Sequence, residues 1–439
     1  MGRIMKNIWL RSVITEENIL SELSPITIKT IPLDSRCVIC KGGRLLCGKV
    51  RCPILTRIYF QMKFKPLVDS LNIKGSSPGI FVGRFGFPYV FIGPLIPPVY
   101  GDTSLLDTPE FWHGKSMDEI IGLRLQLVRG KYRTHVKNFE GKIVELTREI
   151  ALSKSSVESE AHFKRKPSGT IVLDDEVQPF GPSAPLKNLF VSSIKTDQKI
   201  EKAYSDTDLK TSEAVFWLYE KGVLISRIQR AFSAGLFGIE KNRKLVPTRW
   251  SITAVDSIIS QKLLEQVKTF PLINEFRVYE HEALDNKWIV LMIPDYWSYE
   301  LIEAWYPGTT WNLKGKNVWI ISDWEGFEGR SSYPSIGGCY MASRLSVSSK
   351  LKEEKRQASV IVLREIRPGF IMPLGVWNVR ENVKETLKNR PLTFDTLEQS
   401  LQYISTKLNI PLIKWIKISF LLKKFLFQKR LSHFLKTTT

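Results

Sequence analysis

The second half of the chain carries short hydrophobic runs separated by helical patterns. Runs rich in β-branched and aromatic residues occur at Trp288–Ile293, Val318–Ile321 and Ser359–Leu363. Between them, hydrophobic residues recur at the spacing of amphipathic helices. Such alternation is typical of a sheet that is covered by helices. From about residue 271 onward, the sequence therefore predicts an α+β domain.

The first half shows an ordered block that is followed by a polar interruption. The ordered block, residues 61–150, contains a Gly/Pro-rich run at Gly75–Pro98. A helix is predicted after this run, because Ser116 and Glu119 form a capping-box pattern ahead of hydrophobic residues. Residues 153–185 are polar and rich in Pro and Gly, which indicates a long loop or an insertion.

These shifts predict a multi-domain α+β protein with a mixed helical and sheet body. Residues 186–270 have a mostly helical pattern and complete the first domain. The expected divisions are a leader with a four-cysteine segment at 1–60, an N-terminal domain at 61–270 with its polar insertion at about 153–185, a C-terminal α+β domain at 271–425 that ends in a helix, and an extended tail at 426–439. A chain of 439 residues is long enough for several hydrophobic cores.

The net charge of the chain is strongly positive, although its overall composition is that of an ordinary globular protein. Hydrophobic residues make up 43% of the chain and charged residues 25%, both ordinary values. Lys and Arg total 64 against 44 Asp and Glu, which gives a net charge of +20 and a pI near 9.6. This excess favours polyanionic partners, namely DNA, RNA or an anionic membrane surface, although many basic proteins bind none of these.

The sequence predicts a cytoplasmic protein. No stretch of about 20 apolar residues lacks charges, so a transmembrane helix is not expected. The first residues, MGRIMKNIWLRS, lack the apolar run and cleavage site of a signal peptide. Cysteines in this compartment are normally reduced, with intracellular proteins of hyperthermophiles as the known exception.

Four of the five cysteines fall within sixteen residues, in the pattern C-x2-C-x6-C-x4-C. They are Cys37, Cys40, Cys47 and Cys52. Zinc takes four tetrahedral ligands, and a C-x2-C pair supplies two of them from one tight turn. Because four protein ligands leave no open position, the expected site is a structural zinc knuckle. The remaining cysteine, Cys339, stands alone and is expected to pack in the core.

Two other arrangements of these cysteines remain open. An iron–sulfur cluster also uses four cysteine ligands, and the Cys52-Pro53 pair is faintly similar to ferredoxin sequences. Two disulfides are a further alternative, which a reducing compartment disfavours. Basic residues between the cysteines offset the charge of four thiolates and offer a basic surface to phosphates, namely Lys41, Arg44, Lys49 and Arg51.

The C-terminal tail contains a short docking motif. Gln428, Leu431, Phe434 and Leu435 form the pattern Q-x-x-L-x-x-F-L. This pattern resembles the peptide by which replication and repair proteins bind the sliding clamp PCNA. One helical turn places the three apolar side chains together as a plug for a surface pocket, with the glutamine amide at the rim. The alternative is an amphipathic helix end that packs on its own domain.

Several basic residues are candidates for contact with DNA phosphates. Between Lys221 and Arg249 the chain has seven basic residues and one acid, with Trp250 at the edge. This segment is either a DNA-facing stripe or a solvated surface. The candidate phosphate or DNA contacts are Arg84, Arg227, Arg230, Lys244 and Arg249.

Two further segments are candidates for chemistry. The glycine-rich run from Gly79 to Gly86 either brings backbone amides and Arg84 to a phosphate or forms a β-turn between two apolar strands. Asp206, Asp208 and Lys210 lie close together at a predicted helix start. Such a group can hold Mg²⁺ for a nuclease reaction, but acids also gather at helix N-termini for dipole reasons.

Histidine-based catalysis has no support in the sequence. The five histidines lie far apart along the chain and form no metal-binding or triad pattern. Catalytic residues are therefore not identified.

Five long strings in the chain resemble one protein family. They are CVICKGGRLLCGKVRCPIL, SSPGIFVGRFGFPYVFIGPLIPP, LVPTRWSITAVDSIIS, WSYELIEAWYPGT and QASVIVLREIRPGFIMPLGVWNVRE. They closely resemble the archaeal Nre family of DNA repair proteins, and the resemblance runs from about residue 30 to 390. It implies a role in the response to DNA damage and binding to PCNA through the C-terminal motif. It implies no particular reaction.

The expected function is that of a cytoplasmic, nucleoid-associated DNA repair factor. In this hypothesis PCNA recruits the protein through its tail, and basic surface residues bind DNA. The main alternative is a metal-dependent nuclease-like enzyme of nucleic acids or nucleotides, which uses the Asp206, Asp208 and Lys210 group or the glycine-rich loop. A third alternative is a protein that binds a membrane surface through its lysine-rich C-terminal helix.

Overall fold

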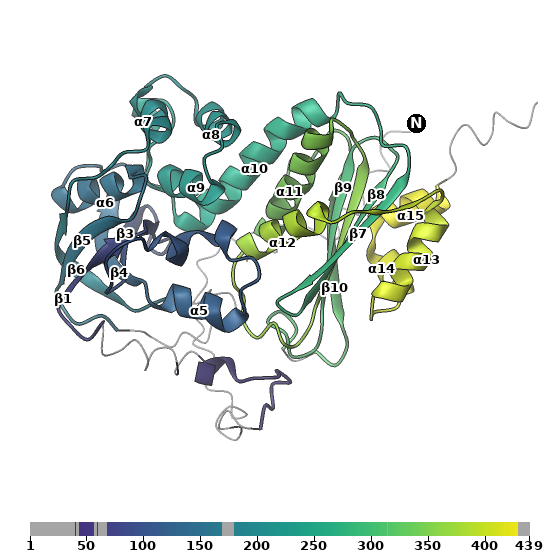
Figure 1. The fold of residues 1–439 in the computed structure, drawn as a ribbon, viewed down its shortest axis with the longest axis horizontal. Coiled ribbons are helices and arrows are strands. Elements are labelled where there is room, and N and C mark those ends of the chain that lie inside the picture. The colour runs from purple at the N-terminus through teal and green to yellow at the C-terminus, as the bar shows by residue number, and fades with distance from the viewer. Residues whose placement is uncertain are drawn as a thin grey trace, which may run out of the picture.

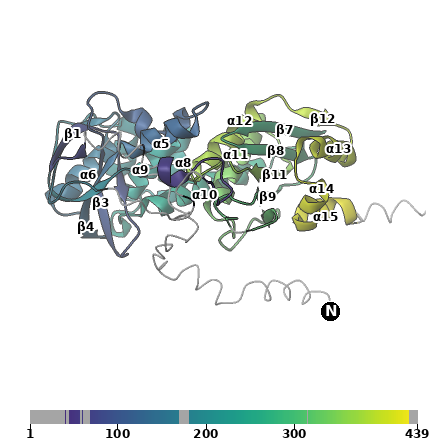
Figure 2. The same ribbon diagram turned by 90° about the horizontal axis from the view of Figure 1, so that it is seen from below.

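The computed structural model describes residues 40, 44–56, 59, 68–168, 180–313 and 315–428. This part of the chain forms two six-stranded sheets. They lie towards opposite ends of an elongated molecule, with helices between them (Figures 1 and 2). The predicted α+β class and the mixed helical and sheet body are confirmed for these residues.

The first sheet is formed by six strands from residues 72–191. In spatial order its strands are β1 (Asn72–Ser77), β5 (Val157–Phe163), β6 (Ser183–Val191), β4 (Val128–His135), β3 (Tyr89–Ile96) and β2 (Gly79–Val82). All neighbouring pairs are antiparallel except β4 and β6, which are parallel.

Most helices of this half cover one face of this sheet, whereas on the other face Tyr89 and Phe91 are exposed and Leu95 packs against Leu106 and Leu127. The helical elements of this half are η1 (Ser104–Asp107), η2 (Pro109–Phe111), α5 (Met117–Leu125), α6 (Lys142–Leu152), α7 (Gln198–Ser205), α8 (Thr211–Glu220), α9 (Ile225–Ser233), η3 (Glu240–Asn242) and α10 (Thr248–Val267). The capping box of Ser116 and Glu119 is confirmed at the start of α5. Along β3, Val90 and Ile92 face the helices and are buried, whereas Tyr89 and Phe91 point outward.

The polar stretch 153–185, predicted as a loop or insertion, is partly a strand of this sheet. Strand β5 has the sequence VESEAHF, in which Val157, Ser159, Ala161 and Phe163 are buried. Buried residues alternate along the strand with the acids and a histidine, which are exposed or half-buried, so its composition is that of a polar segment. Residues 169–179 lie outside the described residues.

The second sheet carries helices on both faces. In spatial order its strands are β10 (Trp319–Glu325), β9 (Ser298–Trp305), β11 (Ser359–Ile366), β8 (Asn286–Ile293), β7 (Phe276–Ala283) and β12 (Leu392–Phe394). The three runs expected as strands correspond to β8, β10 and β11. Strands β9 and β11 are parallel, and both are buried along their whole length. Full burial is what two covered faces require.

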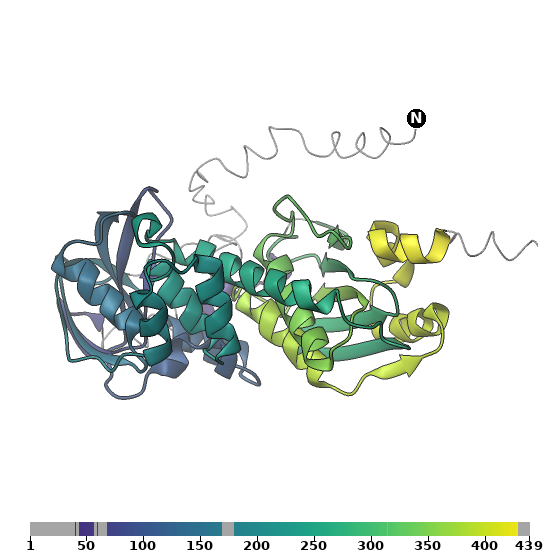
Figure 3. The same cartoon turned by 90° about the horizontal axis from the view of Figure 1, so that it is seen from above.

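The faces are covered by helices from different parts of the chain. Helices α10, α11 (Gly338–Glu354) and α12 (Trp377–Lys388) pack on one face, and α13 (Leu397–Lys407), α14 (Leu412–Ile418) and α15 (Phe420–Phe427) pack on the other (Figure 1). Helix α10 joins the two halves (Figure 3). Its Val255 and Ile259 belong to the core of the first half, and its Leu264 and Val267 belong to that of the second.

The lysine-rich C-terminal segment is part of this core. Leu421 and Leu422 of α15 are buried against the sheet, together with Trp415 of α14. These helices also carry exposed apolar residues, at Ile413, Ile418 and Phe427, so the membrane-surface alternative stays a prediction. No helix in the described part of the chain is long and apolar enough to cross a bilayer.

Candidate nucleic-acid interface

The glycine-rich run from Gly79 to Gly86 forms a β-hairpin, the second of its two expected alternatives. Gly79–Val82 is strand β2, and the chain turns at residues 83–88 to enter β3. The turn is closed by hydrogen bonds from the amide of Gly83 to the carbonyl of Phe91 (2.7 Å) and from the amide of Tyr89 to the carbonyl of Gly86 (2.8 Å). Gly86 has φ +84°, which glycine adopts without steric cost.

The hairpin places aromatic rings and an arginine at the surface. Phe85 is 54% exposed, Phe87 47% and Tyr89 51%. The Arg84 guanidinium lies 5.2 Å from the centre of the Phe85 ring. Because polar groups normally cover such a turn, three exposed rings in five residues are a notable apolar surface.

Strand β4 continues this surface with cations. His135 lies directly opposite Tyr89 in the sheet, with ring centres 5.1 Å apart, and Arg133 lies opposite Phe91. The Arg133 guanidinium is 5.4 Å from the centre of the Tyr89 ring. Lys137 follows the strand and is exposed.

Two further cations, Arg129 and Lys131, lie along β4, where the Arg129 guanidinium is 4.6 Å from the centre of the Phe180 ring. Burial, and then the charge of Arg124, lowers the pKa of Arg129 to about 10. Burial also lowers the pKa of Lys131, and the neighbouring charges of Arg129 and Arg165 act in the same direction. These neighbouring positive charges create a positive electrostatic potential on this side of β4, which attracts anions.

The start of α10 joins the hairpin from the helical side. The hydroxyl oxygen of Thr248 accepts a hydrogen bond from the amide of Val82 (2.9 Å). This bond seats the helix start beside the hairpin, where Trp250 and Phe87 have ring centres 5.1 Å apart. Lys244 and Arg249 are exposed in the same segment.

We call residues 83–91, 129–137 and 244–250 together the basic–aromatic face. Hydrogen bonds join its segments, because the amide of Val136 donates to the carbonyl of Pro88 and the amide of Leu245 donates to that of Val136. These three segments contain no Asp or Glu in their sequences. The face thus brings together the predicted Arg84, Lys244 and Arg249.

Arg227 and Arg230, predicted with them, lie elsewhere. Arg227 makes an ion pair of 2.8 Å with Asp197. Arg230 is buried on α9 and faces the Asp107 carboxylate at 3.8 Å. Both arginines are engaged inside the protein, so they are not part of the basic–aromatic face.

A buried ion pair that the sequence did not suggest joins α10 to α12. The Arg380 guanidinium donates to both oxygens of Asp256, at 2.9 and 3.2 Å, and to Glu381. Gln229 also donates to Asp256. Burial raises the pKa of Asp256 to about 6. Because arginine and carboxylates neutralise one another here, the group fastens the helices rather than offering a free base.

The acidic group at Asp206 serves local structure. One carboxylate oxygen of Asp206 accepts hydrogen bonds from the amides of Asp208 and Leu209, which closes the turn between α7 and α8. Among the described residues, no three or more His, Cys, Asp or Glu side chains form a group that could hold a metal ion. Asp206 is thus engaged in this turn, and the nuclease-like alternative at Asp206, Asp208 and Lys210 stays a prediction.

The described part of the cysteine segment docks between the two halves of the protein. The Lys49 ammonium is buried and donates to the carbonyl of Ile371 (2.9 Å). Arg51 forms a two-bond ion pair with Asp118 of α5. Gly48 and Gly308 approach so closely that a Cβ on Gly308 would lie 3.0 Å from the Gly48 carbonyl carbon.

Within the described residues, neither Cys47 nor Cys52 forms a disulfide, and Cys40 is buried in the same segment. Cys37 lies outside the described residues, so the full set of four ligands is not tested. Thiols within a short glycine-containing loop are the donor set that zinc uses. Cys339 packs against the core of the second half, and burial raises the pKa of its thiol.

The clamp motif falls at the edge of the described chain. Gln428 follows α15 and is exposed, with its amide donating to the carbonyl of Lys424. Leu431, Phe434 and Leu435 lie outside the described residues.

The structure brings two of the five histidines together. The rings of His113 and His281 have centres 6.0 Å apart, and His113 lies 3.9 Å from the Glu385 carboxylate. The sequence had suggested no such grouping, since these residues are far apart along the chain.

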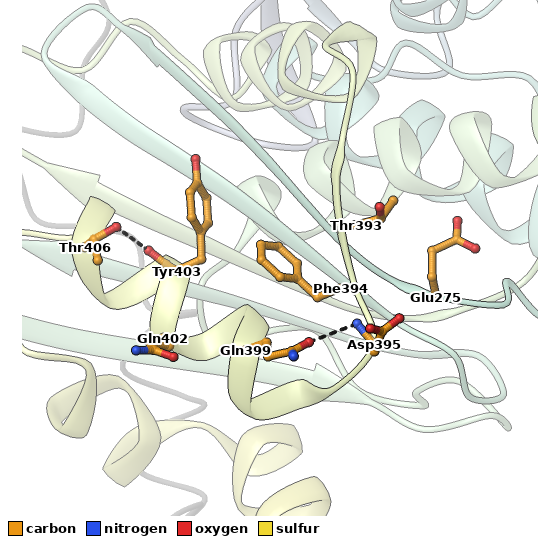
Figure 4. Close-up of a pocket in the computed structure, with 8 residues that line it drawn as sticks. All are labelled: Glu275, Thr393, Phe394, Asp395, Gln399, Gln402, Tyr403 and Thr406. Atoms are coloured by element: carbon orange, nitrogen blue, oxygen red, sulfur yellow. Dashed lines mark hydrogen bonds between the residues drawn. The ribbon is translucent and has the colours of Figure 1, made fainter.

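A pocket of about 480 Å³ lies beside α13 (Figure 4). Its polar groups are used within the protein: the Gln399 side chain accepts from the amide of Asp395, and the Thr406 hydroxyl donates to the carbonyl of Tyr403. The predicted site residues do not line it, and its side chains do not converge on a common point. We assign it no role in chemistry.

Comparison with known proteins places most of the chain in one family. A family model described as "Archaeal Nre, N-terminal" matches residues 46–312, and one described as "Archaeal Nre, C-terminal" matches residues 325–434. The chain belongs to the archaeal Nre family. The resemblance seen in the five sequence strings is thereby confirmed.

Curated members of the Nre family cover most of the chain. "DNA repair protein NreB" of Archaeoglobus fulgidus is 40% identical over 390 residues, which is 88% of this chain and 97% of the relative. "DNA repair protein NreA" of the same organism is 37% identical over 85% of this chain and 93% of the relative. "DNA repair protein NreA" of Haloferax volcanii is 32% identical over 80% and 87%, respectively. No solved structure matches the chain.

The two Nre segments form one folded unit. Strands β7, β8 and β9 belong to the N-terminal match and β11 belongs to the C-terminal match, whereas β10 lies between the two matches except for Glu325. Because β9 pairs with both β10 and β11, the second sheet needs both segments.

Proposed function

We propose that this Nre protein is a DNA-binding repair factor of the cytoplasm and nucleoid that is recruited by the sliding clamp PCNA. The basic–aromatic face is the observation that supports DNA binding most directly. The names of the relatives, which call them DNA repair proteins, support the repair role.

The cations of the face are arranged to bind phosphates. Arg84, Arg133 and Arg249 come from three different segments that hydrogen bonds hold together. No acid occupies the first turn of α10, and no side chain caps its amides. Arg249 in that turn is unfavourable for the helix dipole, and a phosphate at the helix start relieves this. A phosphate backbone that binds here would meet cations from three different segments at once.

Recruitment to PCNA is proposed for the tail that follows α15. Helix α15 is fixed to the second sheet, because the Glu300 carboxylate accepts hydrogen bonds from the amides of Phe420 and Leu421 (2.8 and 2.9 Å). The motif residues Gln428 and Leu431 follow directly after this anchor. A short peptide on a fixed base can reach a neighbouring clamp while the body binds DNA.

A zinc ion is proposed to hold the cysteine segment. Cys37, Cys40, Cys47 and Cys52 would supply its four ligands, and a closed four-thiolate site stabilises a fold without providing a reactive metal position. The docking of Lys49 and Arg51 onto both halves of the body supports this structural role.

DNA binding is tested with the full chain and labelled DNA. Arg84→Gln with Arg249→Gln removes two charges from the face, and we expect about a tenfold or greater loss of affinity at ~100 mM salt, because phosphate contacts dominate binding. Lys384→Gln with Arg390→Gln removes the same charge from exposed positions on and after α12 and should leave affinity unchanged. Equal losses in both variants, or no loss in either, would contradict the proposed face.

Clamp binding is tested separately. Deletion of Gln428–Thr439 should abolish binding of the full chain to PCNA on a sensor surface while DNA affinity stays the same. A tail of identical composition in scrambled order is the matched control and should also fail to bind. Retained clamp binding in either protein would rule out this motif.

A further inference from the structure

We infer that the basic–aromatic face binds single-stranded DNA and stacks unpaired bases on its exposed rings. This inference rests on the proposed DNA-binding function and names the form of DNA that the face recognises.

The exposed rings are the first observation. Phe85, Phe87, Tyr89, Phe91 and Trp250 are between 36% and 54% exposed. Large apolar side chains are usually exposed singly, whereas here Phe87 and Trp250 have ring centres 5.1 Å apart, and Tyr89 and Phe91 point to the same side of β3. The hairpin and its flank therefore offer several neighbouring rings on which a planar apolar partner can stack.

The cations that accompany the rings identify this partner as a nucleic acid. Arg84 lies against Phe85 and Arg133 lies against Tyr89, each within 5.4 Å of the ring centre. A base that stacks on either ring has a guanidinium beside it for the adjoining phosphate. Aromatic rings combined with a basic groove are the recognition pattern for single strands. An acidic protein partner would pair with the cations but would not account for the exposed aromatic rings.

Spacing of the rings favours a single strand over a duplex. Tyr89 and Phe91 lie two residues apart on the same face of β3, which is about 6.8 Å along an antiparallel strand. Bases stacked in a duplex follow one another about every 3.4 Å along each strand. Bases must therefore unstack to occupy both rings, and a paired duplex hides their flat faces.

The test compares a 12-nucleotide oligo(dT) strand, with one central 2-aminopurine, and a duplex hairpin with the same number of phosphates. We expect the full chain to bind the single strand about tenfold more tightly than the duplex, with quenching of the 2-aminopurine fluorescence. Phe87→Leu and Tyr89→Leu, made singly and together, keep an apolar side chain and remove the ring. They should weaken single-strand binding about tenfold and leave duplex binding unchanged.

The control variant is Phe327→Leu, which removes an exposed ring beside a lysine at the opposite end of α10. It lies on the order of 30 Å from Trp250, because α10 has 20 residues. It should change neither affinity. Since the single variants alter half-exposed side chains, circular dichroism and thermal unfolding should match the unmodified chain.

Four outcomes would overturn the inference. Equal affinity of the unmodified chain for both DNAs, or equal losses for both in the ring variants, excludes base stacking while DNA binding by the cations stands. Unchanged single-strand affinity in the double ring variant has the same meaning. Absence of binding to both DNAs overturns the proposed DNA-binding function itself.

Discussion

Lys49 and Ile371, which are 322 residues apart, are joined by a hydrogen bond of 2.9 Å from the buried ammonium to the backbone carbonyl. The bond ties the cysteine segment to the second half of the protein, while the ion pair of Arg51 and Asp118 ties it to the first. The segment therefore acts as a strap across the junction.

Lys49→Met tests this strap. The substitution keeps the length of the side chain but leaves the Ile371 carbonyl without its donor, which costs about 1–3 kcal/mol in a buried position. We expect faster hydrogen exchange at residues 44–56 and little change in the sheets. Lys74→Met, at an exposed ion pair with Glu160, is the control. Equal exchange rates in the unmodified chain and Lys49→Met would show that the segment does not depend on this bond.

Metal removal is expected to loosen the same segment. One zinc per chain should be found by elemental analysis, without the visible absorption of an iron–sulfur cluster. Chelation, or Cys37→Ser with Cys40→Ser, should remove the metal and raise hydrogen exchange at residues 44–56 while the body stays folded. Cys339→Ser should retain the metal. A full zinc content in the double serine variant would refute the four-cysteine site.

The buried pair of Asp256 and Arg380 predicts a pH dependence with a definite sign. Burial raises the pKa of Asp256 to about 6, from about 4 in an unfolded chain. The folded protein therefore keeps this proton at pH values where the unfolded chain has lost it. The stability that the group contributes is complete below pH ~4 and is lost as the pH rises to about 6.

Asp256→Asn removes this titration. The free energy of unfolding of the unmodified chain, measured relative to that of Asp256→Asn, should fall between pH ~4 and ~6 and then stay level. Asp102→Asn is a control of opposite sign, because hydrogen bonds from Ser104 lower the pKa of Asp102. A difference for Asp256→Asn that rises or stays constant across this range would contradict the prediction.

The sequence predicted those parts of the structure that depend on neighbouring residues. The capping box at Ser116 and the hairpin at Gly79–Gly86 are local features, because their signals lie within a few residues. Strand β8 was recognised by its continuous apolar run, which reports burial on both faces.

Long-range pairing and charge burial could not be predicted in this way. Asp256 and Arg380 are 124 residues apart, and nothing near either residue indicates the partner. Arg227 lies in a basic stretch, but its engagement with Asp197 depends on how α7 and α9 pack. The aromatic residues of the interface can be read from the sequence, but their grouping depends on how β3, β4 and α10 pack together.

Glu300 is the anchor of the last helix, and its removal should release the tail-bearing segment. Its carboxylate accepts from the Ser419 hydroxyl (2.6 Å) and from the two amides at the start of α15, and burial raises its pKa. Glu300→Gln keeps the shape but turns an amide group toward donors. We expect a loss of about 1–3 kcal/mol in the free energy of unfolding, because at least one buried donor loses its acceptor.

Hydrogen exchange should locate this effect at residues 419–427, and chemical denaturation should give its size. Glu398→Gln, at an exposed position in α13, is the matched control and should change neither measurement. Clamp affinity provides a further readout. If α15 only positions the tail, Glu300→Gln should weaken PCNA binding less than deletion of the motif does, because the motif itself is intact. Loss of clamp binding as complete as in the deletion would mean that α15 contacts the clamp directly.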